Sequence, residues 1–265
     1  SSRMAPPYDV VRLDSIASTQ DEAGKRYSGK PVLVVAARQT GGRGRAGRAW
    51  QTAPRALAAS LAFAPWWPPP TWGRLSLAAG VAARAVLGEV DLEWPNDLMV
   101  GAEKVGGILV ESGGQVVTAG LGVNLWWPSP PQGIGALHAD DPGSGRAPQL
   151  ARRWADDLLE RVAAGPHRWG LDEYRAACLT IGRLVRWEPD GRGMARDVAP
   201  SGELVVETEA GERRLSSGEV WEVRSAVPSP LPSPQPSPQP PPGGRGRSGG
   251  RGRTKGSGRS GGRLF

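Results

Sequence analysis

The chain has 265 residues, of which 38% are hydrophobic, and a single cysteine, Cys178. This composition is typical of a globular protein of one or two domains and excludes collagen-like fibres and disulfide-rich scaffolds. The formal net charge of +7 is local, because seven cations and no acids lie from Ser225 onward, which leaves 26 of each in residues 1–224. With no membrane-length apolar run and no signal-peptide pattern, we expect a cytoplasmic protein.

In chain order, short apolar runs and residues at helical spacing predict a mixture of strands and helices over the first 181 residues. The predicted strands are 10–13, 32–37, 57–63, 92–94, 107–111 and 116–123. The predicted helices are 18–27, 72–87, 148–162 and 168–181. The sequence therefore predicts an α+β domain over residues 1–181 with a mixed, largely antiparallel sheet.

The pattern changes after residue 181. Residues 182–224 contain five short strand-like segments separated by glycine turns, which predict a small β-barrel or sandwich. Residues 225–265 are rich in Pro and Ser and then in Gly and Arg, a composition typical of a disordered tail. The tail leaves open one non-enzymatic function, which is weak, nonspecific binding of nucleic acid.

A Gly-Arg segment, QTGGRGRAGRAW at residues 39–50, follows the second predicted strand. Its glycines let the backbone approach a ligand, and its arginines offer planar forks that suit carboxylate and phosphate oxygens. The segment is neither a Walker loop nor a dinucleotide fingerprint. It predicts a loop that binds an anion, although its composition alone also fits a flexible surface loop.

Four shorter motifs accompany it: STQDE at 18–22, EWPNDL at 93–98, KVGGILVE at 104–111 and GLGVN at 120–124. Each has a simple structural explanation when taken alone. Thr19 and Glu22 have the spacing of a helix capping box, Pro-Asn-Asp is a common hairpin turn, and Lys104 could be an exposed turn lysine. The two glycines of GLGVN could form a bulge.

In this order and spacing, the five motifs resemble the catalytic domain of the biotin protein ligase family. Residues 193–207 (GMARDVAPSGELVVE) and 216–223 (SSGEVWEV) resemble the C-terminal domain of the same family, so the resemblance covers residues 10–224. It implies a biotin/lipoate ligase catalytic fold, similar to class II aminoacyl-tRNA synthetases, followed by an SH3-like β-barrel at 182–224. The implied enzyme activates biotin with ATP and Mg²⁺ to biotinyl-5′-AMP. It then biotinylates a lysine of a biotin carboxyl carrier protein domain of an acyl-CoA carboxylase.

The resemblance also implies a role for individual residues. Implied biotin-binding residues are Ser18, Thr19, Gln20, Gln39, Gly42, Arg43, Gly44, Arg45, Lys104, Gly106 and Gly107. Implied ATP- and adenylate-binding residues are Arg43, Arg45, Trp50, Asn96, Lys104 and Asn124. Lys104 and Arg45 would stabilise the reacting anions, Asp97 would orient or deprotonate the carrier lysine, and no side chain is assigned as a metal ligand.

The sequence departs from the family pattern at Glu93, where the family usually has lysine. Only about eight residues precede the first predicted strand, so we expect no operator-binding domain and no sequence-specific DNA binding. A homodimer is compatible with the sequence. The rival enzyme is a lipoate or octanoate ligase or transferase of the same fold, one form of which uses a cysteine nucleophile; the apolar surroundings of Cys178 favour a core thiol instead.

Overall fold

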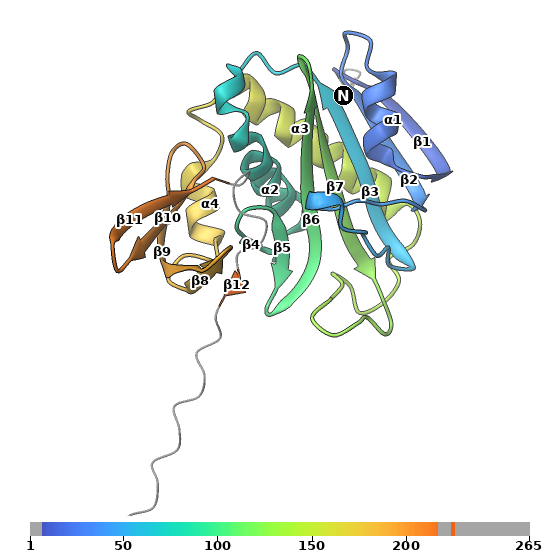
Figure 1. Ribbon diagram of the computed structural model, residues 1–265. Coiled ribbons are helices and arrows are strands. Elements are labelled where there is room, and N and C mark those ends of the chain that lie inside the picture. The colour runs from blue at the N-terminus through green and yellow to red at the C-terminus, as the bar shows by residue number, and fades with distance from the viewer. Residues whose placement is uncertain (1–6, 217–223, 226–265) are drawn as a thin grey trace, which may run out of the picture. The chain divides into compact units, whose positions relative to one another are not determined.

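A computed structural model describes residues 7–216 and the backbone of residues 224–225 (Figure 1). Seven strands form one sheet in the order β1-β2-β3-β7-β6-β5-β4. Their bounds are β1 (Asp9–Ile16), β2 (Val32–Gln39), β3 (Arg55–Phe63), β4 (Asp91–Glu93), β5 (Asp97–Val100), β6 (Glu103–Gly113) and β7 (Val116–Trp126). Only the β1–β2 pair of this sheet is parallel, which confirms the prediction of a mixed, largely antiparallel sheet.

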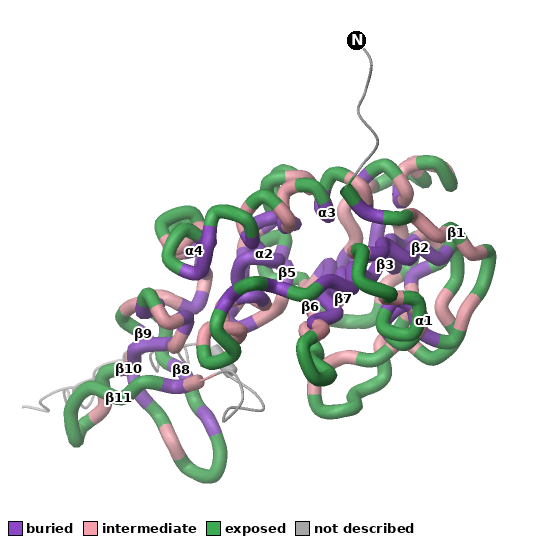
Figure 2. The backbone as a smooth tube through the Cα atoms, turned by 90° about the horizontal axis from the view of Figure 1, so that it is seen from above, coloured by how far each residue is buried: buried purple, intermediate pink, exposed green. Residues whose placement is uncertain are grey.

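Helices cover the two faces of this sheet unequally. They are α1 (Thr19–Arg26), α2 (Gly73–Leu87), α3 (Arg146–Ala164) and α4 (Leu171–Ala177), with short 3₁₀ turns at Arg45–Gly47 and Pro69–Thr71. Side chains of β2 alternate between two cores: Leu33 and Val35 join the large cluster with α2 and α3, whereas Val34 packs with Ala23 of α1. The helix α1 therefore lies on the face opposite α2 and α3 (Figure 2).

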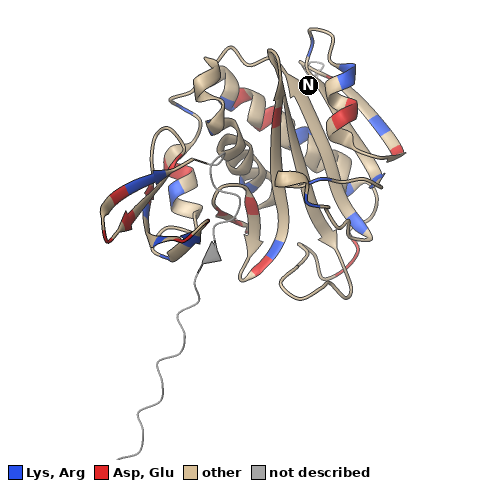
Figure 3. Cartoon of the chain, viewed as in Figure 1, with Lys and Arg blue, Asp and Glu red and all other residues tan. Residues whose placement is uncertain are grey.

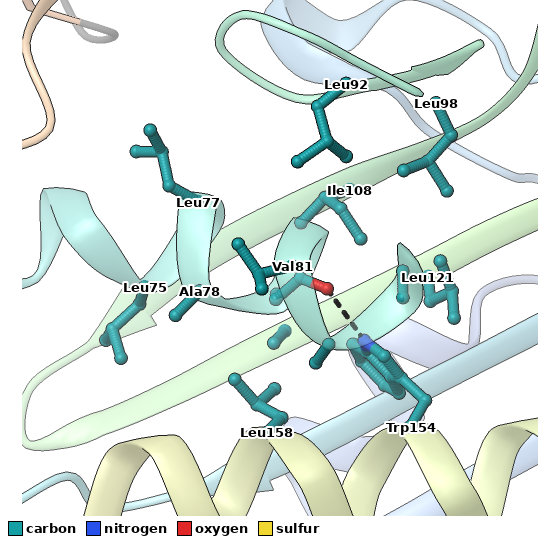
Figure 4. Packing of buried hydrophobic residues seen from close by; sticks show 14 of the residues in the cluster. Leu75, Leu77, Ala78, Val81, Leu92, Leu98, Ile108, Leu121, Trp154 and Leu158 are labelled. Atoms are coloured by element: carbon teal, nitrogen blue, oxygen red, sulfur yellow. Dashed lines mark hydrogen bonds between the residues drawn. The ribbon is translucent and has the colours of Figure 1, made fainter. Parts of the chain in front are cut away.

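The large core is held together where α2 crosses α3. Trp154 of α3 is fully buried among leucines of α2 and of the sheet, and its indole N–H donates to the carbonyl of Ala79 at 3.0 Å (Figure 4). Burial of a large aromatic ring with its polar atom satisfied stabilises the packing of the two helices. Away from this core, acidic and basic residues are interspersed over the described chain (Figure 3), in agreement with its balanced charge.

Two predicted helices differ in detail from the structure. The helix predicted at 168–181 is only Leu171–Ala177, because Cys178 turns to extended backbone and pairs with Leu92 of β4. The helix α1 is capped by Ser18, whose hydroxyl accepts from the Asp21 N–H at 3.3 Å, and not by Thr19. The capping box was therefore predicted one residue too late, since the Thr19 hydroxyl is used elsewhere.

The motif EWPNDL forms a hairpin, as its turn residues predicted, with Glu93 paired to Asp97. The short strand β5 on the far side of this turn was not predicted. Lys104 was predicted in a turn, but it lies on β6, which begins at Glu103 and pairs with β5. The turn is Gly101–Ala102, where the positive φ of Gly101 (58°) suits glycine.

A second, antiparallel sheet follows α4. It contains β8 (Leu184–Trp187), β9 (Gly191–Val198), β10 (Leu204–Thr208), β11 (Gly211–Leu215) and β12 (Arg224–Ser225), in the order β11-β10-β9-β8-β12. The strand predicted at 219–223 and the tail from 226 onward lie outside the described residues. Val185 and Leu204 belong to the same hydrophobic cluster as α2 and β7, so this sheet packs against the first one through a continuous core. No described helix is long and apolar enough to cross a membrane.

Candidate active site

A cavity of about 470 Å³ opens on the face of the large sheet that carries α1. It brings together residues from all five motifs. The predicted site residues that line it are Ser18, Thr19, Gln20, Gln39, Arg43, Gly44, Arg45, Trp50, Asn96, Asp97, Lys104, Gly107 and Asn124. Segments separated by up to about a hundred residues in the chain therefore meet at one site.

The floor of the cavity consists of small residues in register across neighbouring strands. Ala58 of β3 pairs with Gly122 of β7, which pairs with Gly107 of β6. Two residues along, and therefore on the same face, Ser60 lies beside Gly120. Because side chains alternate along a strand, the bulky neighbours of these residues point into the opposite core. The result is a flat surface on which a ligand can lie against the backbone.

At one end of the cavity, neutral polar side chains form a closed hydrogen-bond network. Gln39 Oε1 accepts from the backbone N–H and the hydroxyl of Thr19 at 2.9 and 3.0 Å. The Thr19 and Ser60 hydroxyls are 2.9 Å apart, and Ser60 donates to Gln20 Oε1 at 3.0 Å. The Gln20 amide donates in turn to the carbonyl of Thr118 at 2.8 Å. We call these four side chains, Thr19, Gln20, Gln39 and Ser60, the neutral end.

Gly120 makes room for the neutral end. A Cβ atom at this position would lie 2.5 Å from Gln20 Oε1, closer than real contacts allow, and 3.3 Å from Ser60 Oγ, which is a tight contact. The sequence analysis did not predict Ser60 as a site residue. The alternation of the strand at 57–63 could have identified it, because Ser60 is the one hydroxyl in an otherwise apolar run.

The opposite end of the cavity is charged. The Lys104 ammonium lies 2.7 Å from Asp97 Oδ1 and 5.8 Å from the centroid of the Trp50 ring. The Trp50 indole covers Gly122, where a Cβ atom would lie 3.2 Å from Trp50 Cε2. Arg45 donates to Asn96 Oδ1 at 3.3 Å. We call Arg45, Trp50, Asp97, Lys104 and Asn124 the charged end.

Arg45 is the more deeply placed of the two arginines predicted to bind anions. Burial lowers the pKa of its guanidinium, and the charge of Asp97 opposes this shift. A cation removed from water in this way interacts more strongly with an incoming anion.

Arg43 lines the cavity, but its guanidinium is bound to acidic side chains. It forms a two-pronged ion pair with Asp21 of α1 at 2.7 and 2.8 Å and lies 3.4 Å from Glu111 of β6. This pairing lowers the pKa of Asp21 and raises that of Arg43. The side chain therefore fastens the Gly-Arg loop to α1 and β6, a contact that the sequence did not predict.

The backbone of the Gly-Arg loop is held by hydrogen bonds within the loop. Arg43 and Ala49 form an antiparallel bridge, and the Gly44 N–H donates to the carbonyl of Arg48 at 2.7 Å. The reversal between them uses left-handed backbone at Ala46 and Gly47, with φ of 57° and 69°.

Asn124 combines burial with an unused acceptor. Its side chain is 2% exposed, and its amide nitrogen donates to the carbonyl of Gly135 at 3.0 Å. Its Oδ1 atom has no hydrogen-bond partner among the described residues. An unpaired buried oxygen costs free energy, so it suits a donor group or a cation brought by a ligand.

Two predicted site residues do not line the cavity. Gly106 is packed inside the sheet, where a Cβ atom would lie 2.6 Å from the carbonyl oxygen of Gly122. Gly42 lies within the Gly-Arg loop, where a Cβ atom would lie 2.6 Å from Gln39 Nε2. Both glycines provide space for their neighbours.

Glu93 is the departure from the family pattern, and Cys178 bears on the rival cysteine-dependent enzyme. Glu93 lines the cavity, and its carboxylate is 4.0 Å from the guanidinium of Arg183, just before β8. Cys178 is buried and does not line the cavity, and burial raises the pKa of its thiol. A nucleophilic cysteine needs access and an easily formed thiolate, so the geometry does not support a cysteine-dependent transferase.

Comparisons with known proteins agree with this geometry. Residues 13–125 match the biotin/lipoate A/B protein ligase family, and residues 188–221 match the biotin protein ligase C-terminal domain. A biotin--[acetyl-CoA-carboxylase] ligase from Mycobacterium tuberculosis is 33% identical over 241 residues, which cover 80% of this chain and 90% of that protein. The chain belongs to the biotin protein ligase family. The resemblance stated from the motifs is thereby confirmed.

Further relatives extend this result. A biotin--[acetyl-CoA-carboxylase] ligase from Paracoccus denitrificans is 29% identical, covering 80% of this chain and 98% of that protein. The biotin protein ligase from Aquifex aeolicus solved with biotin and ATP has a TM-score of 0.69 at 23% identity, covering 82% and 99% of the two chains. That from Leishmania major solved with biotinyl-5-AMP has a TM-score of 0.59 at 24% identity, covering 80% and 100%. At these identities the two structures support the biotin protein ligase fold.

Proposed function

We propose that this biotin protein ligase condenses biotin with ATP to biotinyl-5′-AMP and pyrophosphate and then transfers biotin to a lysine of a biotin carboxyl carrier protein domain. The observation that carries the proposal is the division of one cavity into a neutral end and a charged end over a glycine floor. Biotin has the matching division, with a neutral ureido ring at one end and a carboxylate at the other.

The neutral end would bind the ureido ring. Its hydroxyl and amide groups can both donate and accept, as a ureido group requires. The valeryl chain would then run over Ala58 and along the Trp50 indole, which covers Gly122, toward the charged end. There Arg45 and Lys104 would stabilise the biotin carboxylate and the α-phosphate, two anions that must come together for the carboxylate oxygen to attack phosphorus.

The nucleotide would occupy the space beside Trp50 and Asn124. The indole offers a face for stacking against adenine, and Asn124 Oδ1 offers an acceptor to a nucleotide N–H group. Among the described residues, no group of three or more His, Cys, Asp or Glu side chains is placed to hold a metal ion. Magnesium would enter as part of the Mg–ATP substrate, held by phosphate oxygens and water, with the Asn96 and Asn124 amide oxygens nearby.

For the transfer step, the carrier lysine must arrive as a neutral amine. Asp97 lines the cavity, and its contact with the Lys104 ammonium at 2.7 Å fixes the direction of its carboxylate. We assign Asp97 the task of orienting the attacking amine and taking its proton, while Lys104 stabilises the departing AMP.

The C-terminal domain, the acceptor protein and the location of the enzyme are also part of the proposal. The match of residues 188–221 to the biotin protein ligase C-terminal domain and the antiparallel strands β8–β11 support an SH3-like barrel for residues 182–224. The carboxylase named in the relatives supports a carrier domain of an acyl-CoA carboxylase as acceptor. The single cysteine supports a reducing, cytoplasmic location.

The test is an exchange assay followed by a transfer assay. The full chain should catalyse exchange of labelled pyrophosphate into ATP when biotin is added, and not with lipoate or octanoate. Mass spectrometry should then detect one biotinyl increment on a carrier domain, and none on a carrier whose acceptor lysine is replaced by arginine. Exchange supported by lipoate in place of biotin would refute the substrate assignment.

A further inference from the structure

The strands β6 and β7 separate at the charged end of the cavity. They pair continuously from Gly113–Val116 to Gly106–Val123, and the ladder stops there. Beyond this point, residues 133–138 of the loop between β7 and α3 run along both strand ends (Figure 1). We call residues 133–138 the wedge segment.

The wedge segment forms backbone hydrogen bonds with both strands. On the β6 side, the Lys104 N–H donates to the carbonyl of Gly133 at 3.0 Å. On the β7 side, the Leu137 N–H donates to the carbonyl of Asn124 at 3.0 Å. Lys104 and Asn124 therefore stand apart on separated strands, with the wedge segment between them.

Gly135 is the residue where the two sides meet. Its N–H donates to the carbonyl of Lys104, and its carbonyl accepts from the Asn124 side-chain amide, both at 3.0 Å. The second bond commits the Asn124 nitrogen and leaves Oδ1 as the atom without a partner in the described structure. One residue thus fixes the backbone of Lys104 and the orientation of the Asn124 amide.

The space around Gly135 is narrow. A Cβ atom there would lie 2.6 Å from Glu103 Oε2 and 2.9 Å from Glu103 Cβ, with Val105 at 3.3 Å. Its φ is not in the left-handed region, so the restriction comes from the close approach to β6 and not from backbone conformation. The Glu103 carboxylate can swing aside but the Glu103 Cβ atom cannot, so a side chain at position 135 would press the wedge segment away from β6.

We propose that Gly135 is a positioning residue that sets the distance and orientation of Lys104 and Asn124 for the nucleotide. This inference rests on the proposed function, because it assumes that both side chains act on ATP. Gly135 does not line the cavity, and its neighbour Ile134 does. The neutral end lies on other elements, so displacement of the wedge segment should affect ATP strongly and biotin, of which only the carboxylate reaches Lys104, weakly.

The variant Gly135→Ala tests this role against Gly113→Ala. Gly113 lies at the far end of β6, where a Cβ atom meets nothing within 4 Å. Two quantities are measured on the full chain: biotin affinity by calorimetry without ATP, and kcat/KM for ATP in biotin-dependent pyrophosphate exchange. In Gly135→Ala, kcat/KM for ATP should fall about 10- to 100-fold, the scale for misplaced catalytic groups, with biotin affinity within about twofold. Gly113→Ala should match wild type in both.

A rescue experiment separates positioning from a general loss of structure. Because Glu103 is the obstacle and does not line the cavity, Glu103→Gly alone should leave both quantities unchanged, and Glu103→Gly with Gly135→Ala should restore most of kcat/KM for ATP. If Gly135→Ala does not fold, the double variant carries the test: wild-type kinetics support the role, and a folded double variant with impaired ATP kinetics overturns it.

Other outcomes also overturn the inference. A folded Gly135→Ala enzyme with normal kcat/KM for ATP would show that the wedge segment does not position Lys104 and Asn124. Equal losses for biotin and ATP would show a general structural role. Failure of the proposed function is recognised separately, because the wild-type chain would then show no biotin-dependent exchange.

Discussion

The neutral and charged ends of the cavity satisfy their polar atoms in different ways. At the neutral end, Thr19, Gln39, Ser60 and Gln20 are linked to one another, and Gln20 also to the carbonyl of Thr118, so each of the four side chains has a partner within the protein. At the charged end, Asn124 Oδ1 has no partner among the described residues, and burial disfavours the charge on Arg45.

This difference follows from elementary electrostatics. Neutral donors and acceptors can pair within the protein at little cost, whereas buried cations and unpaired oxygens need a partner of opposite character. The neutral end is therefore preformed, and the charged end is completed by its ligand. Substitutions at the charged end should accordingly affect catalysis most, and those at the neutral end should affect affinity.

The largest effect is expected for Lys104→Ala at the charged end. Loss of a positioned electrostatic stabiliser should slow adenylate formation by about 10² to 10³, with a much smaller loss of biotin affinity because only the biotin carboxylate reaches Lys104. Biotin-dependent pyrophosphate exchange measures the rate. Lys30→Ala is the control, because Lys30 is exposed and pairs only with Asp9 away from the cavity. Near-normal exchange by Lys104→Ala would show that the charge of Lys104 does not contribute to adenylate formation.

Arg45→Gly should affect retention of the intermediate more than its formation. The substitution removes a hydrogen bond from a half-buried charge, so biotinyl-5′-AMP should dissociate about 10 to 100 times faster. The free acyl phosphate should then label bystander amines, visible on streptavidin blots. The control is Arg192→Gly on β9, whose side chain pairs with Glu209. No added labelling at equal adenylate production would contradict the assignment.

At the neutral end, Gly120→Ala should weaken biotin binding about 10-fold without a comparable change in KM for ATP. The added Cβ atom must displace the Gln20 amide, 2.5 Å away, and so break a buried hydrogen bond. Titration calorimetry with biotin measures the change. An effect confined to ATP would reverse the assignment of the two ends.

The smallest effect is expected for Asp21→Asn, which weakens the ion pair with Arg43 that fastens the Gly-Arg loop. Both side chains are partly exposed, so the pair should contribute little. Trypsin should cleave within the loop about two to five times faster, and the difference should shrink at high salt. Asp9→Asn removes a comparable exposed pair elsewhere and serves as the control. An unchanged cleavage rate would show that Arg43 does not hold the loop.

Much of the fold and the membership of the site were predictable from local sequence. The run at 32–37 is wholly apolar and that at 57–63 is apolar except for Ser60, and both became strands of the large sheet. The motifs marked the site residues because their order and spacing together resemble one family, although each motif alone has a simple structural explanation.

What could not be predicted depends on contacts between distant segments. Trp50 lies against Gly122, and Arg43 is bound to Asp21, although nothing in either segment indicates its partner. Gly106 looked like a ligand-contacting glycine, yet it serves the packing of β6 on β7. No motif or predicted element covers the wedge segment, because its order comes from hydrogen bonds to two strands and not from its own residues.

The anchoring of Trp94 limits how this enzyme can be re-engineered. Its buried indole donates to the carbonyl of Gly202 at 3.0 Å, and its backbone N–H donates to Thr180 Oγ1 at 2.9 Å. The turn that presents Asn96 and Asp97 is thus fastened from behind by segments more than eighty residues further along the chain. A chimaera that takes its C-terminal sheet from a homologue should therefore keep the 199–203 turn together with the WPND hairpin, because the bond from Trp94 to Gly202 joins the two segments.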